Sequence, residues 1–299
     1  MSARVAVVVV SFESREEVLA CLDSVARHAG CPVETVVVDN ASSDRTAEAV
    51  RERHPEVRIL ANAVNVGFAG ACNQGLAASS APFVLFLNPD AELEAGALPT
   101  LLARLSARPD LGVVAPRIRR PDGTVEVSTG RDLTPLSEWR QRRLVRGAAR
   151  GDATALAEAA ARHSVEHEPD WVSGAALLAR RAALEAVAGF DAGFFLYEED
   201  ADLCRRLREA GWRVAFTPDA DVRHRRGASM SRAASRARLE YHRSHLRYYA
   251  RHNAPPARIA LRLLLLGRAL VGLPASVLRR GSSAPAEARG LLRLALRGR

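Results

Sequence analysis

The stretch that decides the fold is V-A-V-V-V-V-S at residues 5–11, an unbroken apolar run that ends in a serine. A strand buried on both faces has this composition, whereas a strand with one wet face alternates apolar and polar residues. Residues 15–29 follow with apolar side chains at helical spacing, and that pattern stops at Gly30. The run therefore predicts the first strand of a buried parallel sheet, followed by its crossover helix.

The same alternation continues through the first half of the chain. Further strands are predicted at residues 35–38, 57–60, 83–87 and 112–115, and intervening helices end near residues 53, 80 and 107. Strands that alternate with helices form a mainly parallel sheet with helices on both faces. We therefore expect an α/β fold of the Rossmann-like kind.

The second half of the chain is less regular. Residues 116–170 contain a predicted turn at 121–123 and an arginine-rich stretch at 140–150. Helices are predicted again at 181–187 and 198–211, and two short strands at 213–216 and 220–224. The remainder is predicted to be a helical tail.

Charge is distributed unevenly along the chain. The net charge is +9, yet residues 225–299 contain 17 arginines and two acidic residues, so that this tail carries +15 and the first 224 residues sum to −6. A basic tail can bind nucleic acid or an anionic membrane, and composition does not choose between them.

The cysteines and the N-terminus predict a cytoplasmic protein. The four cysteines, Cys21, Cys31, Cys72 and Cys204, are widely spaced and form no C-x-x-C pair, so we expect reduced thiols that behave as small apolar residues. The first apolar run is too short for the core of a signal peptide.

Polar residues follow three of the predicted strands. They are Ser11, the pair Asp39–Asn40 and the turn Asn88–Pro89–Asp90. Each alone could cap a helix or start a turn. In an open α/β sheet, however, ligands bind outside the carboxyl ends of the strands. Three such ends in one sheet predict a nucleotide site.

Six motifs in order carry a resemblance to a known family. They are V-V-V-S-F, V-V-V-D-N-A-S-S-D, N-V-G-F-A-G-A-C-N-Q-G, F-L-N-P-D, W-V-S-G-A and F-F-L-Y-E-E-D-A-D-L-C. Together they resemble the family-2 glycosyltransferases of the GT-A fold, in particular the rhamnosyltransferase-like branch. The resemblance covers about residues 4–227.

The resemblance implies a site for the donor nucleotide. Asp39 is implied to accept a hydrogen bond from the ring N–H of uracil or thymine, and Ser11 and Phe12 to line the base and ribose. The helix start within residues 65–75 offers backbone N–H groups to the diphosphate. Alternatively, the glycines there only permit tight packing. The implied donor residues are Ser11, Phe12, Asp39, Asn40, Asn65, Gly67 and Asn88.

The resemblance also implies a metal site. Asn88–Pro89–Asp90 stands where the family has its D-x-D signature, so Asp90 is implied to bind Mg²⁺ or Mn²⁺, which bridges the diphosphate. Asn88 replaces the first aspartate, so the metal must depend more on the donor phosphates. His224 resembles a late histidine that completes the metal sphere, although a histidine at a strand end can equally be a surface residue.

The acidic run at residues 198–200 resembles the family's E-D motif. The implied general base is Asp200, with Glu199 beside it in the catalytic set. Carboxylates at a helix start are also favourable for purely electrostatic reasons, and Asp202 is spaced to pair with Arg206. Trp171 and Gly174 resemble an acceptor-binding loop, and core packing is the alternative for the tryptophan.

The tail is expected to lie on a membrane without crossing it. Residues 259–278 are strongly apolar, but Arg262 and Arg268 interrupt them and Pro274 is expected to break the helix. A basic stripe that also includes Arg258 suits an anionic membrane interface. Alternatively, the leucines pack on the catalytic domain or on a second subunit.

Together these expectations describe a catalytic domain at residues 1–230 and a membrane-proximal tail at 231–299. The implied reaction is the metal-dependent transfer of rhamnose or a similar sugar, with inversion, from a dTDP- or UDP-sugar to a lipid-linked saccharide at the inner face of the cell membrane. The rivals are a nucleotidyltransferase, which lacks a base at Asp200, and a nucleic-acid-binding protein. We expect no nucleic-acid partner.

Overall fold

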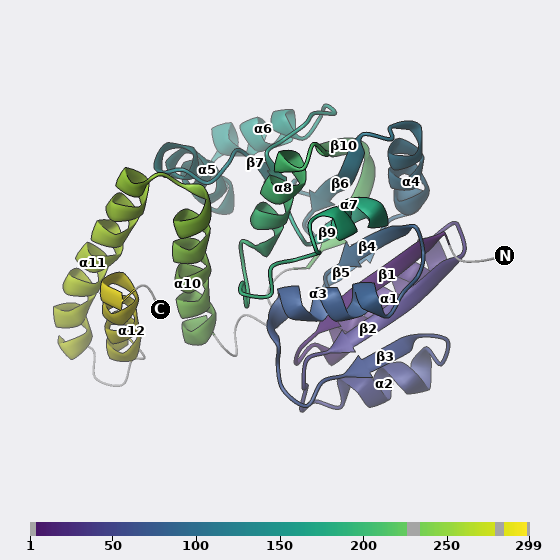
Figure 1. The fold of residues 1–299 in the computed structure, drawn as a ribbon, viewed down its shortest axis with the longest axis horizontal. Coiled ribbons are helices and arrows are strands. Elements are labelled where there is room, and N and C mark those ends of the chain that lie inside the picture. Colours follow the sequence, from purple (N-terminus) through teal and green to yellow (C-terminus); the bar gives the residue numbers. More distant parts are fainter. Residues whose placement is uncertain (1–3, 226–233, 279–283, 298–299) are drawn as a thin grey trace.

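An eight-stranded sheet forms the body of the computed structural model, which describes residues 4–225, 234–278 and 284–297. Figure 1 shows the sheet, in the order β3-β2-β1-β4-β9-β6-β10-β5. Its strands are β1 (Val5–Ser11), β2 (Val33–Asp39), β3 (Arg58–Ala61), β4 (Phe83–Leu87), β5 (Ala91–Leu93), β6 (Leu111–Arg119), β9 (Ala176–Arg180) and β10 (Arg213–His224).

Most neighbouring strands of the sheet are parallel. β3, β2, β1 and β4 run in one direction, and β6 is parallel to β10. β9 is antiparallel to both β4 and β6, and β5 is antiparallel to β10. The expected α/β fold with a mainly parallel sheet is confirmed.

Helices cover both faces of the sheet. One face packs on α1 (Arg15–His28), α2 (Thr46–Arg53) and α4 (Ala97–Ala107), and the other on α3 (Gly67–Ala77), α7 (Arg181–Ala186) and α8 (Glu199–Glu209). Within β1, Val5, Val7 and Val9 belong to the first core, and Ala6, Val8 and Val10 to the second. Both faces of β1 are buried, which explains its unbroken apolar sequence.

The irregular region 116–170 forms a small unit beside the sheet. It contains β7 (Thr129–Gly130) paired with β8 (Trp171–Val172), and the helices α5 (Pro135–Ala149) and α6 (Ala153–Arg162). The turn expected at 121–123 is present, with Gly123 at φ 82° and its N–H bound to the carbonyl of Arg120. The arginine-rich stretch lies within α5.

The C-terminal tail is helical, as expected. It consists of α10 (Ala234–His252), α11 (Pro255–Leu278) and α12 (Ala284–Arg297). In Figure 1 α10 lies between the body and the other two helices. Phe194 and Ala201 of the body share one apolar cluster with Tyr248 and Tyr249 of α10. The tail therefore docks on the body. Within the described ranges, none of the helices has the length and apolar character needed to cross a bilayer.

Two expectations about elements were wrong. Pro274 does not end a helix, because α11 continues to Leu278. α12 packs along α11, and such packing can outweigh the local cost of a proline. The strands expected at 213–216 and 220–224 are one strand, β10, whose pairing with β6 shifts register between Thr217 and Asp221. The irregularity at Pro218 and Asp219 interrupts the sequence pattern without ending the strand.

Candidate active site

The first part of the site is at the carboxyl ends of β1 and β2. Ser11 pairs in register with Asp39, and its hydroxyl donates a 3.1 Å hydrogen bond to Oδ1 of that carboxylate. Ser42 adds its backbone N–H at 3.3 Å and its hydroxyl. Asp39 is buried, whereas the neighbouring Phe12 is 40% exposed. The Asp39 carboxylate is therefore held in one orientation, and an exposed aromatic residue follows its partner Ser11 in the chain.

Asn40 and Asn65 build the loop that leads into α3. The side-chain amide of Asn40 donates to the carbonyl of Gly67 at 3.1 Å, and Oδ1 of Asn65 accepts the N–H of Gly67 at 2.9 Å. Gly67 has φ 81°, and a Cβ there would lie 2.6 Å from the carbonyl oxygen of Phe195. Close backbone packing therefore explains Gly67 directly, in line with the packing alternative.

The second part of the site joins Asp90 to His224. The turn after β4 brings Asp90 beside the end of β10, where Nε2 of His224 lies 3.1 Å from Oδ1 of Asp90. Nδ1 of the same ring lies 3.3 Å from Oε2 of Glu126, which is buried. Burial lowers the pKa of His224, but the hydrogen bonds to Asp90 and Glu126 outweigh burial and raise the pKa to about 9. His224 is buried rather than a free surface residue.

Asp90 and His224 are the residues of this site that would hold a divalent cation. Among the described residues no group of three or more His, Cys, Asp or Glu side chains could hold a metal ion by itself. Asp90 would supply a carboxylate oxygen, the ligand that Mg²⁺ and Mn²⁺ share, and His224 an imidazole nitrogen, which suits a transition metal ion better than Mg²⁺. Glu126 orients the ring, because a histidine ligand usually has its second nitrogen bound to a carboxylate.

The third part of the site is Asp200, in the first turn of α8. Both of its carboxylate oxygens accept backbone N–H groups at 2.8 Å, Oδ2 from Gly174 and Oδ1 from Ala201. Burial raises the pKa of Asp200, and these hydrogen bonds oppose the rise. A carboxylate with a raised pKa, held in one orientation, is suited to act as a general base.

Backbone contacts connect the turn Asn88–Pro89–Asp90 to Asp200. The N–H of Asn88 donates to the carbonyl of Ala175 at 2.9 Å, and Ala175 follows Gly174, whose N–H is bound to Asp200. A Cβ at Gly174 would lie 3.5 Å from that of Asp200. Gly174 thus orients the carboxylate of Asp200.

The other expected residues of this region serve different contacts. Burial, followed by the charge of Asp200, raises the pKa of Glu199 well above its ordinary value, which favours the neutral acid. Asp202 and Arg206 form the expected ion pair, at 2.7 Å. Trp171 donates its ring N–H to the carbonyl of Arg131 at 2.9 Å and packs on apolar clusters, as the core alternative predicts.

The sequence motifs did not identify two residues that complete the site, Glu126 and His245. Glu126 is 98 residues from His224 in the sequence and lies in the irregular region. His245 of α10 contacts Glu198 at the start of the acidic run, 47 residues earlier. The unusual density of histidine and tyrosine in residues 241–252 was the only hint that this helix face is buried.

Comparison of the sequence with known proteins gives consistent matches. Residues 6–159 match the family described as "Glycosyl transferase family 2", and residues 156–283 match "Glycosyl transferase family group 2". The N-acetylglucosaminyl-diphospho-decaprenol L-rhamnosyltransferase of Mycobacterium tuberculosis is 32% identical over 247 residues, which cover 79% of this chain and 80% of the relative. The rhamnosyltransferase WbbL of Escherichia coli is 38% identical over 82 residues, 27% of this chain and 31% of the relative.

A solved structure matches the whole fold. The mannosyltransferase PcManGT from Pyrobaculum calidifontis, in complex with GDP-Man and Mn²⁺, superposes with a TM-score of 0.59 at 19% identity. The match covers 99% of this chain and 88% of the other. It therefore includes the helical tail.

Proposed function

This chain belongs to glycosyltransferase family 2 and has the GT-A fold, and we propose that it transfers rhamnose or a similar sugar from a dTDP- or UDP-sugar to a lipid-linked saccharide. The relative from Mycobacterium tuberculosis is named for an N-acetylglucosaminyl-diphospho-decaprenol acceptor and an L-rhamnosyl donor group. A place in the synthesis of a cell-surface polysaccharide follows from such an acceptor.

The observation that carries the proposal is the orientation of Asp200 by two backbone N–H groups. An acceptor hydroxyl gives its proton to Asp200 while its oxygen forms a bond to the anomeric carbon of the donor sugar. The bond between that carbon and the diphosphate breaks in the same step, and the nucleoside diphosphate leaves with the electron pair. Attack opposite the leaving group inverts the anomeric configuration.

The remaining residues of the site bind the donor in this proposal. Asp39 accepts the ring N–H of the base, beside Phe12. Asp90 and His224 would hold Mg²⁺ or Mn²⁺, which supplies positive charge to neutralise the departing diphosphate. Glu126 keeps Nε2 of His224 directed toward Asp90.

A transfer assay tests the proposed reaction. The full chain, with Mg²⁺ or Mn²⁺, is incubated with N-acetylglucosaminyl-diphospho-polyprenol and, in turn, dTDP-rhamnose, a UDP-sugar and GDP-mannose. We expect a product heavier by one sugar and release of dTDP or UDP. A product heavier by a nucleotide would support the nucleotidyltransferase alternative. Salt-sensitive DNA binding without transfer from any donor would support the nucleic-acid alternative.

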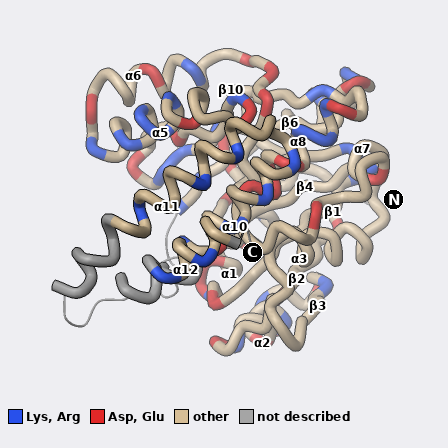
Figure 2. Tube along the Cα trace, turned by 60° about the vertical axis from the view of Figure 1, so that its left-hand side comes forward, with Lys and Arg blue, Asp and Glu red and all other residues tan. Residues whose placement is uncertain are grey.

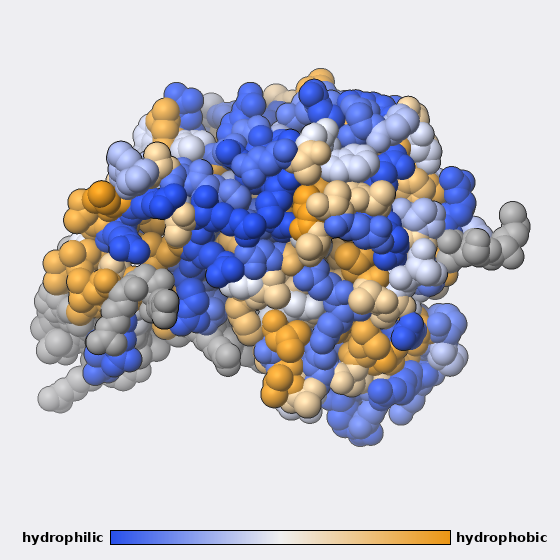
Figure 3. Space-filling model, in the orientation of Figure 1, coloured by the Kyte–Doolittle hydropathy of each residue, from blue (hydrophilic) through white to orange (hydrophobic). Residues whose placement is uncertain are grey.

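We further propose that α11 attaches the enzyme to the inner face of the cell membrane. Ile259, Leu263 and Leu270 are each more than half exposed, and on a helical wheel they fall within about 40° of one another. Arg262 and Arg268 are also exposed. On the same wheel Arg262 lies about 60° from Ile259, beside the apolar face, and Arg268 lies nearly opposite it. Figure 3 shows apolar surface over α11, at the left of the view, and Figure 2 shows basic residues along the helix.

An exposed apolar face with an arginine beside it suits a helix that lies in the plane of an anionic membrane. The leucines enter the acyl boundary while the arginine side chains reach back to the headgroups. Such attachment would bring the site to a lipid-linked acceptor.

A further inference from the structure

The segment that leads into Asp200 has a strained backbone. Tyr197 and Glu198 have φ angles of 71° and 64°, and Ala188, earlier in the same connection, has φ 57°. Residues other than glycine rarely adopt this left-handed conformation, and it persists only where surrounding contacts hold it. Residues 191–198, which we call the catalytic turn, therefore need external support to keep Asp200 in place.

One side of the catalytic turn is held by the donor-binding half of the site. The N–H of Phe68 donates to the carbonyl of Phe195 at 2.8 Å. Gly67 makes this approach possible, because any side chain there would meet the backbone of Phe195. The first residues of α3 thus fix the middle of the turn.

The other side of the turn is held by α10. The hydroxyl of Ser244 donates to the carbonyl of Leu196 at 2.8 Å, and Nδ1 of His245 lies 2.6 Å from Oε1 of Glu198. Leu196 and Glu198 are the residues immediately before and after Tyr197. Ser244 and His245 are adjacent on α10, so one turn of this helix binds the residues on both sides of Tyr197.

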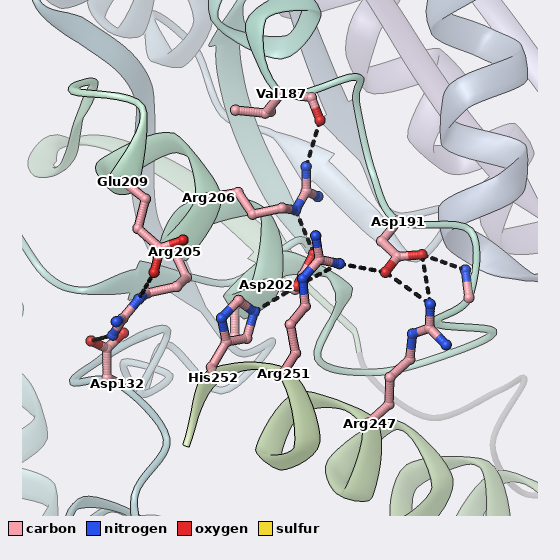
Figure 4. A network of polar contacts seen from close by, with 12 residues as sticks. Asp132, Val187, Asp191, Asp202, Arg205, Arg206, Glu209, Arg247, Arg251 and His252 are labelled. Atoms are coloured by element: carbon pink, nitrogen blue, oxygen red, sulfur yellow. Dashed lines mark hydrogen bonds and ion pairs between the residues drawn. The ribbon is translucent and has the colours of Figure 1, made fainter. Parts of the chain in front are cut away.

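Two arginines of α10 bind the start of the catalytic turn. Arg247 and Arg251 pair with Asp191 at 3.0 and 2.6 Å, as Figure 4 shows. The N–H of Gly193 also donates to Asp191, and a Cβ at Gly193 would collide with the guanidinium of Arg247. The turn is therefore shaped to accept α10.

The same helix face reaches α8 itself. Nε2 of His252 lies 2.7 Å from Oδ1 of Asp202, which is fully buried and two residues after the base. Arg206 binds the other oxygen of Asp202 and the carbonyls of Val187 and Gly189. Figure 4 shows these side chains converging from α8 and α10. Residues on both sides of Asp200 are consequently bound to the tail.

Among the α10 side chains that make these contacts, His245 is the most buried. Its Nε2 lies 3.1 Å from Oε1 of Glu138 on α5, and Glu138 also accepts hydrogen bonds from Tyr249 and Arg142. Burial lowers the pKa of His245, but Glu198 and Glu138 outweigh it and raise the pKa to about 9. Glu138 and Glu198 thus both face the ring of His245, and Arg142 pairs with Glu138.

We propose that α10 is part of the catalytic centre, with His245 as a positioning residue that holds Glu198 and, through the catalytic turn, sets the place of Asp200. This inference rests on the proposed function, in which Asp200 is the base. In this proposal the catalytic domain extends beyond the boundary at residue 230 that the sequence predicted, to the end of α10 at His252.

The test compares His245→Gln with Arg243→Ala in the full chain. Arg243 is an exposed residue of the same helix that pairs with Glu240, also on α10, and serves as the control. We expect His245→Gln to lower kcat by about 10-fold to 10²-fold, as a misplaced catalytic group does, with the KM for the donor and the calorimetric affinity and stoichiometry for UDP or dTDP unchanged. Arg243→Ala should keep wild-type kcat.

A double-mutant cycle and a pH profile separate positioning from general stability. Glu198→Gln should lower kcat as His245→Gln does, and the double variant should be no worse than either single variant, because both remove one contact. In the wild type kcat should also fall near pH 9 as the imidazolium between Glu138 and Glu198 loses its proton, and His245→Gln should lack this fall. If His245→Gln does not fold, Glu198→Gln tests the contact from the other partner.

Asp200→Asn distinguishes an error in the proposed base from an error in the proposed positioning role of α10. If Asp200→Asn is inactive while folded His245→Gln and Glu198→Gln turn over normally, the positioning role of α10 is wrong and the proposed base stands. If Asp200→Asn retains normal turnover, the proposed base is wrong. Additive effects of His245→Gln and Glu198→Gln would also overturn the positioning role.

Discussion

The backbone N–H of Gly174 donates a 2.8 Å hydrogen bond to Oδ2 of Asp200. This contact joins the loop before β9 to the first turn of α8, and it leaves the carboxylate little freedom to rotate. A base that is fixed before the acceptor binds needs no reorientation during the reaction.

Asp200→Asn keeps this shape and removes the basicity. We expect turnover to fall by on the order of 10² to 10⁴, the usual contribution of a general base, while donor affinity stays near that of the wild type. Glu199→Gln should do less damage, because Glu199 already favours its neutral form. Initial rates and calorimetric donor affinity for both variants check this. Near-normal turnover of Asp200→Asn with loss in Glu199→Gln would place the base at Glu199.

The raised pKa of Asp200 has a consequence for the pH profile. The base must be deprotonated, so kcat should fall as the pH decreases through its pKa, and burial places this fall above the ordinary aspartate range. Measurement of kcat at saturating substrate from about pH 4 to neutrality shows the position of the acidic limb. A rate that stays constant down to the ordinary range would contradict the assignment.

Asp39→Ala tests recognition of the uracil or thymine ring of the donor. Removing the carboxylate that Ser11 and Ser42 orient should weaken the binding of UDP or dTDP by about 1 to 3 kcal/mol, because the ring N–H of the nucleotide loses its acceptor. Ser43→Ala, an exposed change in the same loop, is the control. Unchanged nucleotide affinity of Asp39→Ala by calorimetry would exclude the role.

Asp90→Asn tests a proposed metal ligand, and Glu126→Gln tests the residue that orients the other proposed ligand, His224. Asp90→Asn should abolish transfer and metal-dependent donor binding without unfolding the chain. Glu126→Gln should weaken the affinity for Mn²⁺ by about 10-fold to 100-fold, because the His224 ring loses the carboxylate that orients it. Titration of Mn²⁺ in the presence of UDP measures both effects. Full activity of folded Asp90→Asn in EDTA would refute the site.

Membrane attachment through α11 can be tested with two aspartates. Leu263→Asp combined with Leu270→Asp should release the protein from vesicles that contain phosphatidylglycerol, and so should removal of residues 256–299. Leu136→Asp, an equally exposed leucine on α5, is the control. Salt should weaken binding of the wild-type chain. Equal vesicle binding by the double variant would show that this face is not the attachment surface.

The sequence predicted the parts of the molecule that obey local rules. The buried runs before Ser11 and Asp39 identify parallel strands, and strand order places their polar ends at one edge. The motif that contains Asp200 was found through its resemblance to a family. Pro274 was wrongly predicted to break the helix, because helix propensity does not include the packing of α12 along α11.

The contacts that complete the site could not be read from any local pattern. Glu126 reaches His224, and His245 reaches Glu198, across long sequence separations. A single sequence provides no measure of which distant residues meet. Glu126 lies outside any helix or strand, and His245 is one of several charged and aromatic residues on α10, so neither position has a pattern that identifies its partner.

The pairing of Asp191 with Arg247 and Arg251 bears on how the chain is made. During translation, the sheet and α8 are synthesised before α10. Until then the carboxylate of Asp191 is without its two arginines, and Asp202 is without His252. We therefore expect the nascent enzyme to complete its active centre only at the end of synthesis, so that chains released early by a premature stop codon contain every catalytic motif and remain inactive.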